Sequence, residues 1–389
     1  MSSNSGSSTK WDVQRAMTDR APLLHPLAGC DLDTYLAHLR LNSRYSERSL
    51  KQRILATAVV GLRQPFTALE KLTWKSRIES YELPSDPIFI VGHWRSGTTH
   101  LHNLLSRDPQ FAFLDFGQTA MPHNLLSHNK LGRHFISRAL PKKRGYDNVE
   151  LTIEEPQEEE MALGSLNPLG YYCVYYFPQD MKRHFERSVF FNGANEDEKA
   201  DFRHAYLTLA KKLSLAYDGK QLLFKNPPST ARITLLKELF PSARFIYIHR
   251  NPYEVFSSSM NRYFRLMNVF AWQDFEDVDF EEMVFYKYQR LIRAYLDQRR
   301  KIPDSDLAET TYEKITEDPM GEIERLFDQL RIPNKKPGLE AIAPYAERKK
   351  TYKRNVHQLT QHQVDRIEKD WEFAFQEWPY DVPEGIEVV

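Results

Sequence analysis

Short apolar runs bounded by turn residues mark the strands expected in this chain. One run, Ile-Phe-Ile-Val at 88–91, lies between Pro87 and Gly92 and shows no polar alternation. Such a run is typical of a strand that is buried on both faces of a parallel sheet. Strands are also expected over 111–114, 221–224, 245–248 and 307–312. We therefore expect several strands that pair in one sheet.

Between these runs, apolar residues recur at helical spacing. Leucines three and four residues apart follow the first strand over 98–105, and the tracts 196–217 and 280–300 are amphipathic. A strand, a helix and a second strand over 221–248 make one βαβ unit. This alternation predicts an α/β protein of three layers, in which helices cover both faces of a central parallel sheet.

The region before the first strand is predicted to be helical. Leucines at mixed spacings of three and four run through 31–81, whereas the first ten residues are polar and low in complexity. We expect a disordered tail over 1–12, a helical segment packed on the core over 13–84 and one α/β domain over 85–389.

An aliphatic run at 54–62 in the helical segment bears on location. Its nine residues fall short of the roughly 20 that span a bilayer. The N-terminus lacks the apolar stretch of a secretory signal, and two cysteines give no disulfide framework, so we expect a cytoplasmic protein. The run either faces the core or lies in a membrane interface as an amphipathic helix, which would give a weak peripheral contact through the N-terminal helices.

Charge is balanced, with 53 basic and 53 acidic residues, so no global field attracts nucleic acid or an anionic membrane, and any anion site has to be local. The stretch Gly-His-Trp-Arg-Ser-Gly-Thr-Thr at 92–99 predicts such a site, because it joins the end of a strand to the start of a helix. The first backbone N–H groups of a helix have no intrahelical partner, and the helix dipole adds positive charge there.

This loop departs from the nucleotide-triphosphate P-loop, GxxxxGK[ST], in an informative way. Gly92, Gly97 and Thr99 are in register, but Thr98 occupies the lysine position and Arg95 adds a cation inside the loop. The lysine that reaches the β- and γ-phosphates is therefore missing. A P-loop kinase or NTPase stays as an alternative, but the loop favours another phosphate-bearing donor.

The stretch Arg95-Ser96-Gly97-Thr98-Thr99 after a hydrophobic strand resembles the 5′-phosphosulfate-binding loop of sulfotransferases that use 3′-phosphoadenosine 5′-phosphosulfate (PAPS). The form with arginine is that of carbohydrate, tyrosylprotein and many bacterial members, whereas cytosolic members carry lysine. The resemblance implies a P-loop-like fold. It also implies that Arg95 neutralises the bridging oxygen of the leaving phosphate, and that the next four residues hold the 5′-phosphate through N–H and hydroxyl groups.

A second match lies at the end of the strand 245–248. Sulfotransferases hold the 3′-phosphate with an arginine at this strand end and a serine eight positions later, and Arg250 and Ser258 have that spacing. Family members also close a basic C-terminal loop over the 3′-phosphate, which makes Lys353 and Arg354 candidates. A solvated basic loop is the alternative for these two residues.

The catalytic groups match the family only in part. Lys225 matches a lysine that family members carry close to the sulfuryl group, but Pro227 stands where cytosolic members have a catalytic histidine. The positions that correspond to the glutamate of tyrosylprotein and heparan members are not acidic. A different general base is therefore expected.

The acidic run at 154–160 supplies the first candidates for that base. Glu158 and Glu159 lie four residues before Ala162 and Leu163, so a helix that buries those two residues turns both carboxylates inward. Many bacterial sulfotransferase-like sequences resemble this one in having a proline and then an acidic run here. A solvated helix start is the alternative. After Glu158 or Glu159, the order is His123 and then Asp115.

An aromatic segment suggests the acceptor. Its rings form either core or the wall of an acceptor pocket: Tyr171, Tyr172, Tyr175, Tyr176 and Phe177. The resemblance implies transfer of the sulfuryl group to a hydroxyl of a small-molecule, lipid or carbohydrate acceptor without a required metal. A non-catalytic nucleotide-binding relative is the remaining alternative. The sequence leaves the acceptor and the oligomeric state open.

Overall fold

In the computed structural model, the described residues are 24–127, 133–134, 137, 152–349 and 357–389. The tail expected over 1–12 lies outside them. So do Lys353 and Arg354.

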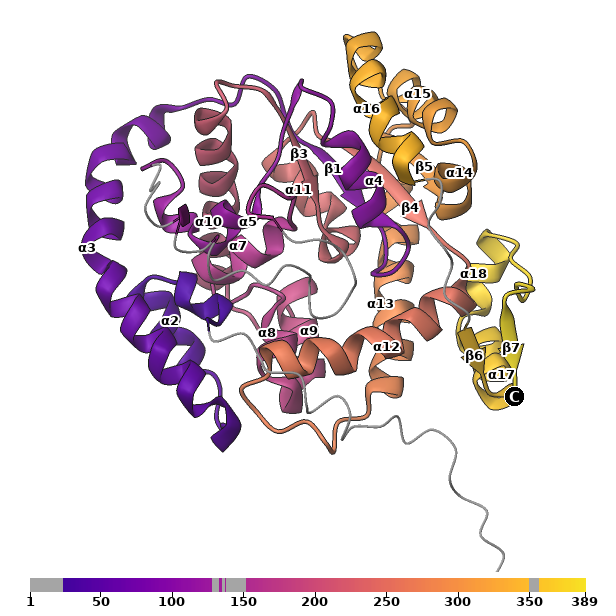
Figure 1. The fold of residues 1–389 in the computed structure, drawn as a ribbon, viewed down its shortest axis with the longest axis horizontal. Coiled ribbons are helices and arrows are strands. Elements are labelled where there is room, and N and C mark those ends of the chain that lie inside the picture. The colour runs from indigo at the N-terminus through magenta and orange to yellow at the C-terminus, as the bar shows by residue number, and fades with distance from the viewer. Residues whose placement is uncertain (1–23, 128–132, 135–136, 138–151, 350–356) are drawn as a thin grey trace, which may run out of the picture.

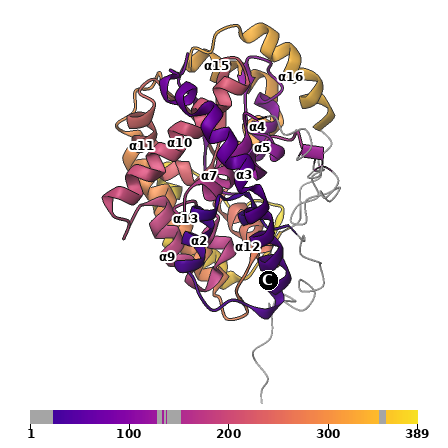
Figure 2. The same cartoon turned by 90° about the vertical axis from the view of Figure 1, so that its left-hand side faces the viewer.

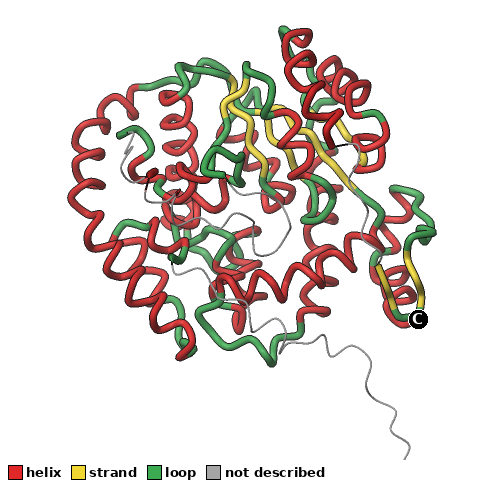
Figure 3. The backbone as a smooth tube through the Cα atoms, viewed as in Figure 1, coloured by secondary structure: helices red, strands yellow, loops and turns green. Residues whose placement is uncertain are grey.

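Five parallel strands form the central sheet in the order β2-β3-β1-β4-β5 (Figure 3). They are β1 (Ile88–Val91), β2 (Phe111–Ala112), β3 (Gln221–Lys225), β4 (Arg244–His249) and β5 (Leu307–Thr311). Each coincides with a predicted strand, although β2 is shorter than predicted. Because all five strands are parallel, their carboxyl ends meet at one edge of the sheet, and β1 lies between β3 and β4 at its centre.

Alternate side chains of β1 enter two separate hydrophobic cores. Ile88 and Ile90 pack in one core with residues of α4 (Thr98–Leu105), α15 (Pro319–Gln329) and α16 (Lys335–Lys349). Phe89 and Val91 pack in the other core. That core includes residues of α10 (Glu196–Ala216), α11 (Ile233–Leu239) and α13 (Phe280–Arg299). The sheet is therefore covered on both faces, which confirms the predicted three-layer α/β/α fold.

Most of the other helices extend the second core, whereas α14 adds Ile315 to the first (Figure 1). They are α5 (Phe116–Ala120), α7 (Glu159–Leu166), α8 (Cys173–Tyr176), α9 (Met181–Val189), α12 (Pro252–Phe270), α14 (Tyr312–Glu317), α17 (Gln361–Asp370) and α18 (Glu372–Glu377). A second, two-stranded parallel sheet joins β6 (His357–Leu359) to β7 (Ile386–Val388) and was not predicted.

The N-terminal region is helical, as expected for 31–81. It contains α2 (Leu32–Arg40) and the long α3 (Leu50–Ser80), which runs along the left-hand edge of the molecule in Figure 1. The division into a helical segment and an α/β domain stays a prediction. Within the described ranges, none of the helices is both long and apolar enough to cross a bilayer. Cys30 and Cys173 are buried free thiols.

Candidate active site

Two glycines shape the loop that connects β1 to α4. Gly92 has a φ of 149°, and a Cβ there would lie 2.2 Å from the carbonyl oxygen of Ile248 on β4. Gly97 has a φ of 95°, and a Cβ there would lie 2.5 Å from the ring of Tyr312. Both backbone conformation and space therefore require glycine at these positions. The loop is held tightly against the strand end of β4 and the start of α14.

The start of α4 presents backbone donors. Gly97 is the N-cap and makes no side-chain capping bond, so the first N–H groups of the helix are available to an anion. The side chains of Ser96 and Thr98 are buried beside it. Arg95 has a φ of 73°, in a region that residues other than glycine rarely occupy. Strain of this kind is characteristic of functional loops.

The two predicted phosphate-binding groups are in direct contact. Arg95 Nε donates to Ser258 Oγ at 2.7 Å, and Arg250 Nη1 donates to the carbonyl oxygen of Arg95 at 3.4 Å. Glu254, one turn before Ser258 on α12, accepts from Arg250 Nε at 2.8 Å. The Arg250 guanidinium also lies 4.2 Å from the ring centroid of Tyr312. Arg95, Ser258 and Arg250 therefore line one region at the carboxyl ends of β1 and β4.

Lys225, the last residue of β3, forms the second part of the site. Its Nζ lies 2.6 Å from Glu158 Oε1 and 3.5 Å from Thr99 Oγ1. The Lys225 side chain is 4% exposed and that of Glu158 is 13% exposed. Tyr172 donates to the other carboxylate oxygen of Glu158 at 3.5 Å. A cation, a carboxylate and a phenol thus meet beside the helix start.

Glu159 has a different position from Glu158. It is fully buried, and its carboxylate accepts from Tyr206 Oη at 2.7 Å and from the backbone N–H of Lys225 at 3.1 Å. Burial raises the pKa of Glu159 to about 7. Glu159 therefore holds the backbone at the end of β3, while Glu158 contacts the side chain of Lys225.

Glu160 is also buried, which the sequence analysis missed. Its carboxylate accepts from Arg232 Nη1 at 2.8 Å, from Asn226 Nδ2 at 2.6 Å and from the backbone N–H of Tyr171 at 2.6 Å. Glu154 is exposed, so the alternative of a solvated helix start applies to that part of the acidic run only. The sequence pattern predicts that Glu158 and Glu159 turn inward and does not include Glu160. This expectation is corrected, because α7 begins at Glu159 and its whole first turn is buried.

The remaining candidates for the base have other partners. His123 Nε2 lies 3.1 Å from the carbonyl oxygen of Ser165, and burial lowers the His123 pKa to about 4. Asp115 caps α5, accepting from the backbone N–H of Gln118 at 2.8 Å, and forms an ion pair with Arg133 at 2.9 Å. Burial raises the Asp115 pKa. None of the described hydrogen bonds and ion pairs of His123 and Asp115 involves Lys225.

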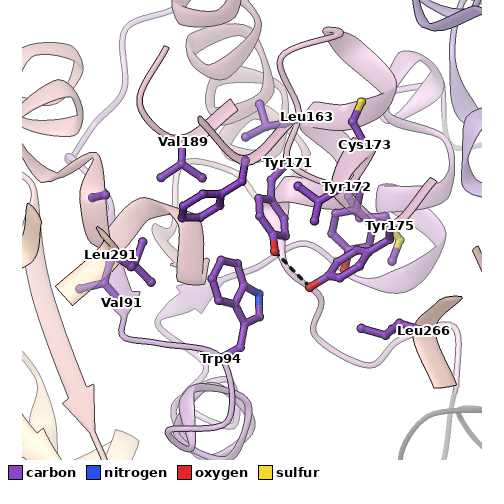
Figure 4. Close-up of a cluster of buried hydrophobic side chains, with 14 of the residues drawn as sticks. Val91, Trp94, Leu163, Tyr171, Tyr172, Cys173, Tyr175, Val189, Leu266 and Leu291 are labelled. Atoms are coloured by element: carbon purple, nitrogen blue, oxygen red, sulfur yellow. Dashed lines mark hydrogen bonds between the residues drawn. The ribbon is translucent and has the colours of Figure 1, made fainter. Parts of the chain in front are cut away.

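The aromatic segment is buried throughout, yet parts of it reach the site. Tyr171 stacks on Trp94 of the loop, with ring centroids 4.7 Å apart, and its hydroxyl lies 3.4 Å from that of Tyr175 (Figure 4). Lys287 of α13 lies beside these rings, with Nζ 4.2 Å from the Trp94 centroid, and donates to the hydroxyls of Tyr171 and Tyr263. Burial lowers the Lys287 pKa well below its usual value.

A cavity of about 10 Å³, close to the size of one water molecule, lies next to this lysine. Among its lining atoms, His93 Nε2 and Ser259 Oγ are buried without a hydrogen-bond partner in the described part of the chain. No pattern in the sequence pointed to Lys287. Among the described residues, no group of three or more His, Cys, Asp or Glu side chains is placed to hold a metal ion.

A glycine-bounded loop between a central strand and a helix, with cations at the ends of the strands beside it, defines an α/β phosphate-binding protein of the P-loop type. Residues 87–336 match the sulfotransferase family, and the chain belongs to that family. It is therefore a sulfotransferase, which confirms the prediction in preference to a P-loop kinase or NTPase.

Similar proteins span nearly the whole chain. The omega-hydroxy-beta-dihydromenaquinone-9 sulfotransferase Stf3 of Mycobacterium bovis is 25% identical over 355 residues, which are 91% of this chain and 90% of that protein. Sulfotransferase STF9 of Mycobacterium avium has a similar crystal structure, with a TM-score of 0.71, 16% identity and coverage of 98% and 99% of the two chains. For STF1 of Mycobacterium tuberculosis the TM-score is 0.61, with 15% identity and 92% of both chains covered.

Proposed function

We propose that this enzyme uses PAPS as its sulfuryl donor and transfers the group to a hydroxyl of a hydrophobic, lipid-like acceptor. The observation that carries the donor assignment is the contact between Arg95, Ser258 and Arg250. A donor with phosphate at both its 5′ and 3′ positions requires two anion sites that face one region. The contact between Arg250 and the loop that precedes α4 supports that arrangement, with backbone donors at the start of α4 and a guanidinium at Arg250.

The residues present fit such a donor. Gly97 leaves the first N–H groups of α4 open to the 5′ end, where Ser96, Thr98 and Thr99 add hydroxyls. Arg250 is held at its Nε by Glu254, so its guanidinium is oriented before a 3′-phosphate arrives. Ser258 positions Arg95 by accepting from its Nε. PAPS, when bound, supplies an activated sulfuryl group on a phosphate leaving group.

Lys225 and Glu158 carry the transfer step in this proposal. Sulfuryl transfer resembles phosphoryl transfer, in which charge spreads over equatorial oxygens and the leaving group, and the protein mainly positions and stabilises. Lys225, 3.5 Å from Thr99, and Arg95 would stabilise that charge. Glu158 would accept the proton of the acceptor hydroxyl, because its carboxylate is next to Lys225 and is partly exposed.

Glu159 is the weaker candidate for the base. Its carboxylate is fully buried and holds the backbone of Lys225 and the hydroxyl of Tyr206. An acceptor hydroxyl would have to displace one of these partners to reach it. We therefore assign Glu159 a positioning role for β3, and Glu158 the role of general base.

Two observations support a hydrophobic acceptor. Tyr172 comes from the buried aromatic segment and donates to Glu158, which puts an aromatic ring beside the proposed base. The relative Stf3 is named for a dihydromenaquinone acceptor and is similar to this chain over 91% of its length. We place the reaction in the cytoplasm, since both cysteines are free thiols.

Transfer from labelled PAPS to a panel of long-chain alcohols, phenols and sugars tests this proposal. We expect label in a long-chain alcohol or phenol with the unchanged protein and its loss with Glu158→Gln. Glu154→Gln is the matched control, because Glu154 is an exposed residue of the same acidic run and should keep full activity. Transfer only to sugars would reject the acceptor class, and unchanged transfer with Glu158→Gln would reject the base.

A further inference from the structure

The outer face of α3 is apolar although it faces solvent. Six of its large hydrophobic side chains are between 50% and 84% exposed: Leu50, Ile54, Leu62, Phe66, Leu69 and Leu72. Contiguous apolar surface of this kind on a single protein indicates an interaction site. Figure 2 turns that side of the molecule toward the viewer and shows α3 lying at the surface in front of the other described helices.

These residues form one continuous stripe. At 3.6 residues per turn, the exposed apolar positions from Ile54 to Leu72 fall within an arc of about 160°, and the stripe is about 28 Å long. Smaller residues fill the gaps between the large ones: Ala58, Gly61, Pro65 and Ala68. The charged residues of this span lie outside the arc. We call this stripe the α3 outer face.

Polar contacts on the opposite side of α3 fix this orientation. Glu70 is buried and pairs with Lys212 of α10 at 2.6 Å, and it accepts from the backbone N–H of Ser127 at 2.9 Å. Arg63 donates to the carbonyl oxygen of Ala28 at 2.6 Å. Rolling the helix to bury its apolar stripe would break these buried contacts. The exposed stripe is therefore a specified feature of the fold.

The charges beside the stripe indicate its occupant. The exposed charged side chains of α3 are Lys51 near its start and Lys71, Lys75, Arg77 and Glu79 near its end, four basic against one acidic. An apolar helix face bordered by basic residues is the pattern of a helix that lies in the interface of an anionic bilayer. Two copies of α3 packed antiparallel about a twofold axis would instead bring basic ends together.

We propose that the α3 outer face docks the enzyme on an anionic phospholipid bilayer, with α3 parallel to the membrane plane. Leu62, Phe66 and Leu69 enter the acyl boundary, while Lys71, Lys75 and Arg77 contact the headgroups. The helix lies on the bilayer and does not cross it. This inference goes beyond the proposed reaction and does not depend on it, because docking requires neither donor nor acceptor.

Flotation of the full chain with vesicles tests the proposal. Vesicles of phosphatidylcholine with phosphatidylglycerol should carry the protein, and vesicles of phosphatidylcholine alone should carry at least severalfold less. The variant Leu62→Gln/Phe66→Gln/Leu69→Gln should lose at least tenfold in bound fraction, and Lys71→Glu/Lys75→Glu should lose binding to the anionic vesicles. Val382→Gln/Val388→Gln, which changes exposed apolar residues far along the chain, is the matched control and should bind normally.

Other outcomes would overturn the proposal. The melting temperature of the Leu62→Gln/Phe66→Gln/Leu69→Gln variant should be unchanged, because the substituted side chains are exposed, and an unchanged melting temperature shows that the variant is folded. A folded variant that floats as well as the unchanged protein contradicts membrane docking. Sedimentation without vesicles that shows a dimer, which the same variant splits, would identify the face as a contact between two copies instead.

Discussion

The Lys225 ammonium lies 2.6 Å from the Glu158 carboxylate, and the next glutamate accepts a hydrogen bond from the backbone N–H of the same lysine. Two adjacent acidic residues thus hold the side chain and the main chain of one cation. The arrangement buries the Lys225 side chain beside Thr99. Preorganisation of this kind is what electrostatic stabilisation of a transition state requires.

Glu158→Gln should lower kcat by about 10²-fold to 10⁴-fold, because it removes the proposed proton acceptor. Affinity for adenosine 3′,5′-bisphosphate should stay within about threefold, since the phosphates are proposed to bind at the start of α4 and at Arg250, whereas Glu158 pairs with Lys225. Steady-state kinetics and calorimetry on the same preparation separate the two effects. A parallel loss of bisphosphate affinity would mean that Glu158 organises the donor site instead.

Glu159→Gln should flatten the dependence of stability on pH. Burial raises the pKa of Glu159 to about 7, above the usual 4.5, so the folded state favours the neutral acid. The stability that this raised pKa contributes is complete below pH 4.5 and is lost as the pH rises through 7. Between pH 4.5 and pH 7 the free energy of unfolding falls by up to about 1.4 kcal/mol per pH unit. Urea unfolding between pH 5 and pH 8 should show a steeper fall for the unchanged protein than for Glu159→Gln. Equal slopes would contradict a raised pKa.

Glu160→Ala should destabilise the fold by about 3–5 kcal/mol, because it leaves Arg232 charged, buried and without its carboxylate. The exposed pair Arg203 and Glu238 provides the comparison, and Glu238→Ala should cost no more than about 1 kcal/mol. Urea denaturation measures both free energies of unfolding. Similar small losses for the two variants would show that the Glu160 carboxylate is dispensable to the core.

Lys287→Met should alter stability on the alkaline side of neutrality. Burial lowers the pKa of Lys287, so the folded state favours the neutral amine, whereas the unfolded chain takes up a proton below its usual pKa of 10.5. The free energy of unfolding of the unchanged protein should therefore rise more between pH 7 and pH 9 than that of the variant. Lys182→Met is the control, since Lys182 also faces an aromatic ring but is exposed. The same slope in all three proteins would refute a neutral Lys287.

The parts of the fold that the sequence predicted are those with a local signature. The strand at 88–91 is buried on both faces, so its four apolar residues identify it without further context. The loop that follows is recognisable because Gly92 and Gly97 meet Ile248 and Tyr312 so closely that no larger residue fits. The spacing of Arg250 and Ser258 is similarly local, being set by one turn and one helix.

What the sequence could not reveal depends on partners far along the chain. Glu160 is distinguished from its neighbours by Arg232, 72 residues away, and Glu159 by Tyr206, 47 residues away. Lys287 lies on an amphipathic helix, where a single lysine predicts solvent, and its aromatic surroundings come from separate segments. Likewise, β6 and β7 have three residues each, too few for a periodic signal.

The central claim is that one donor reaches from the start of α4 to Arg250, and calorimetric titration of Arg250→Ala tests it most directly. Adenosine 3′,5′-bisphosphate and adenosine 5′-phosphate differ only in the 3′-phosphate. Comparing their affinities therefore separates the 3′-phosphate site from the 5′-phosphate site. Removing Arg250 should weaken the bisphosphate by about 10-fold to 100-fold, as expected for a charged hydrogen bond, and leave the 5′-phosphate unaffected. An equal effect on both nucleotides, or none on either, would contradict the account.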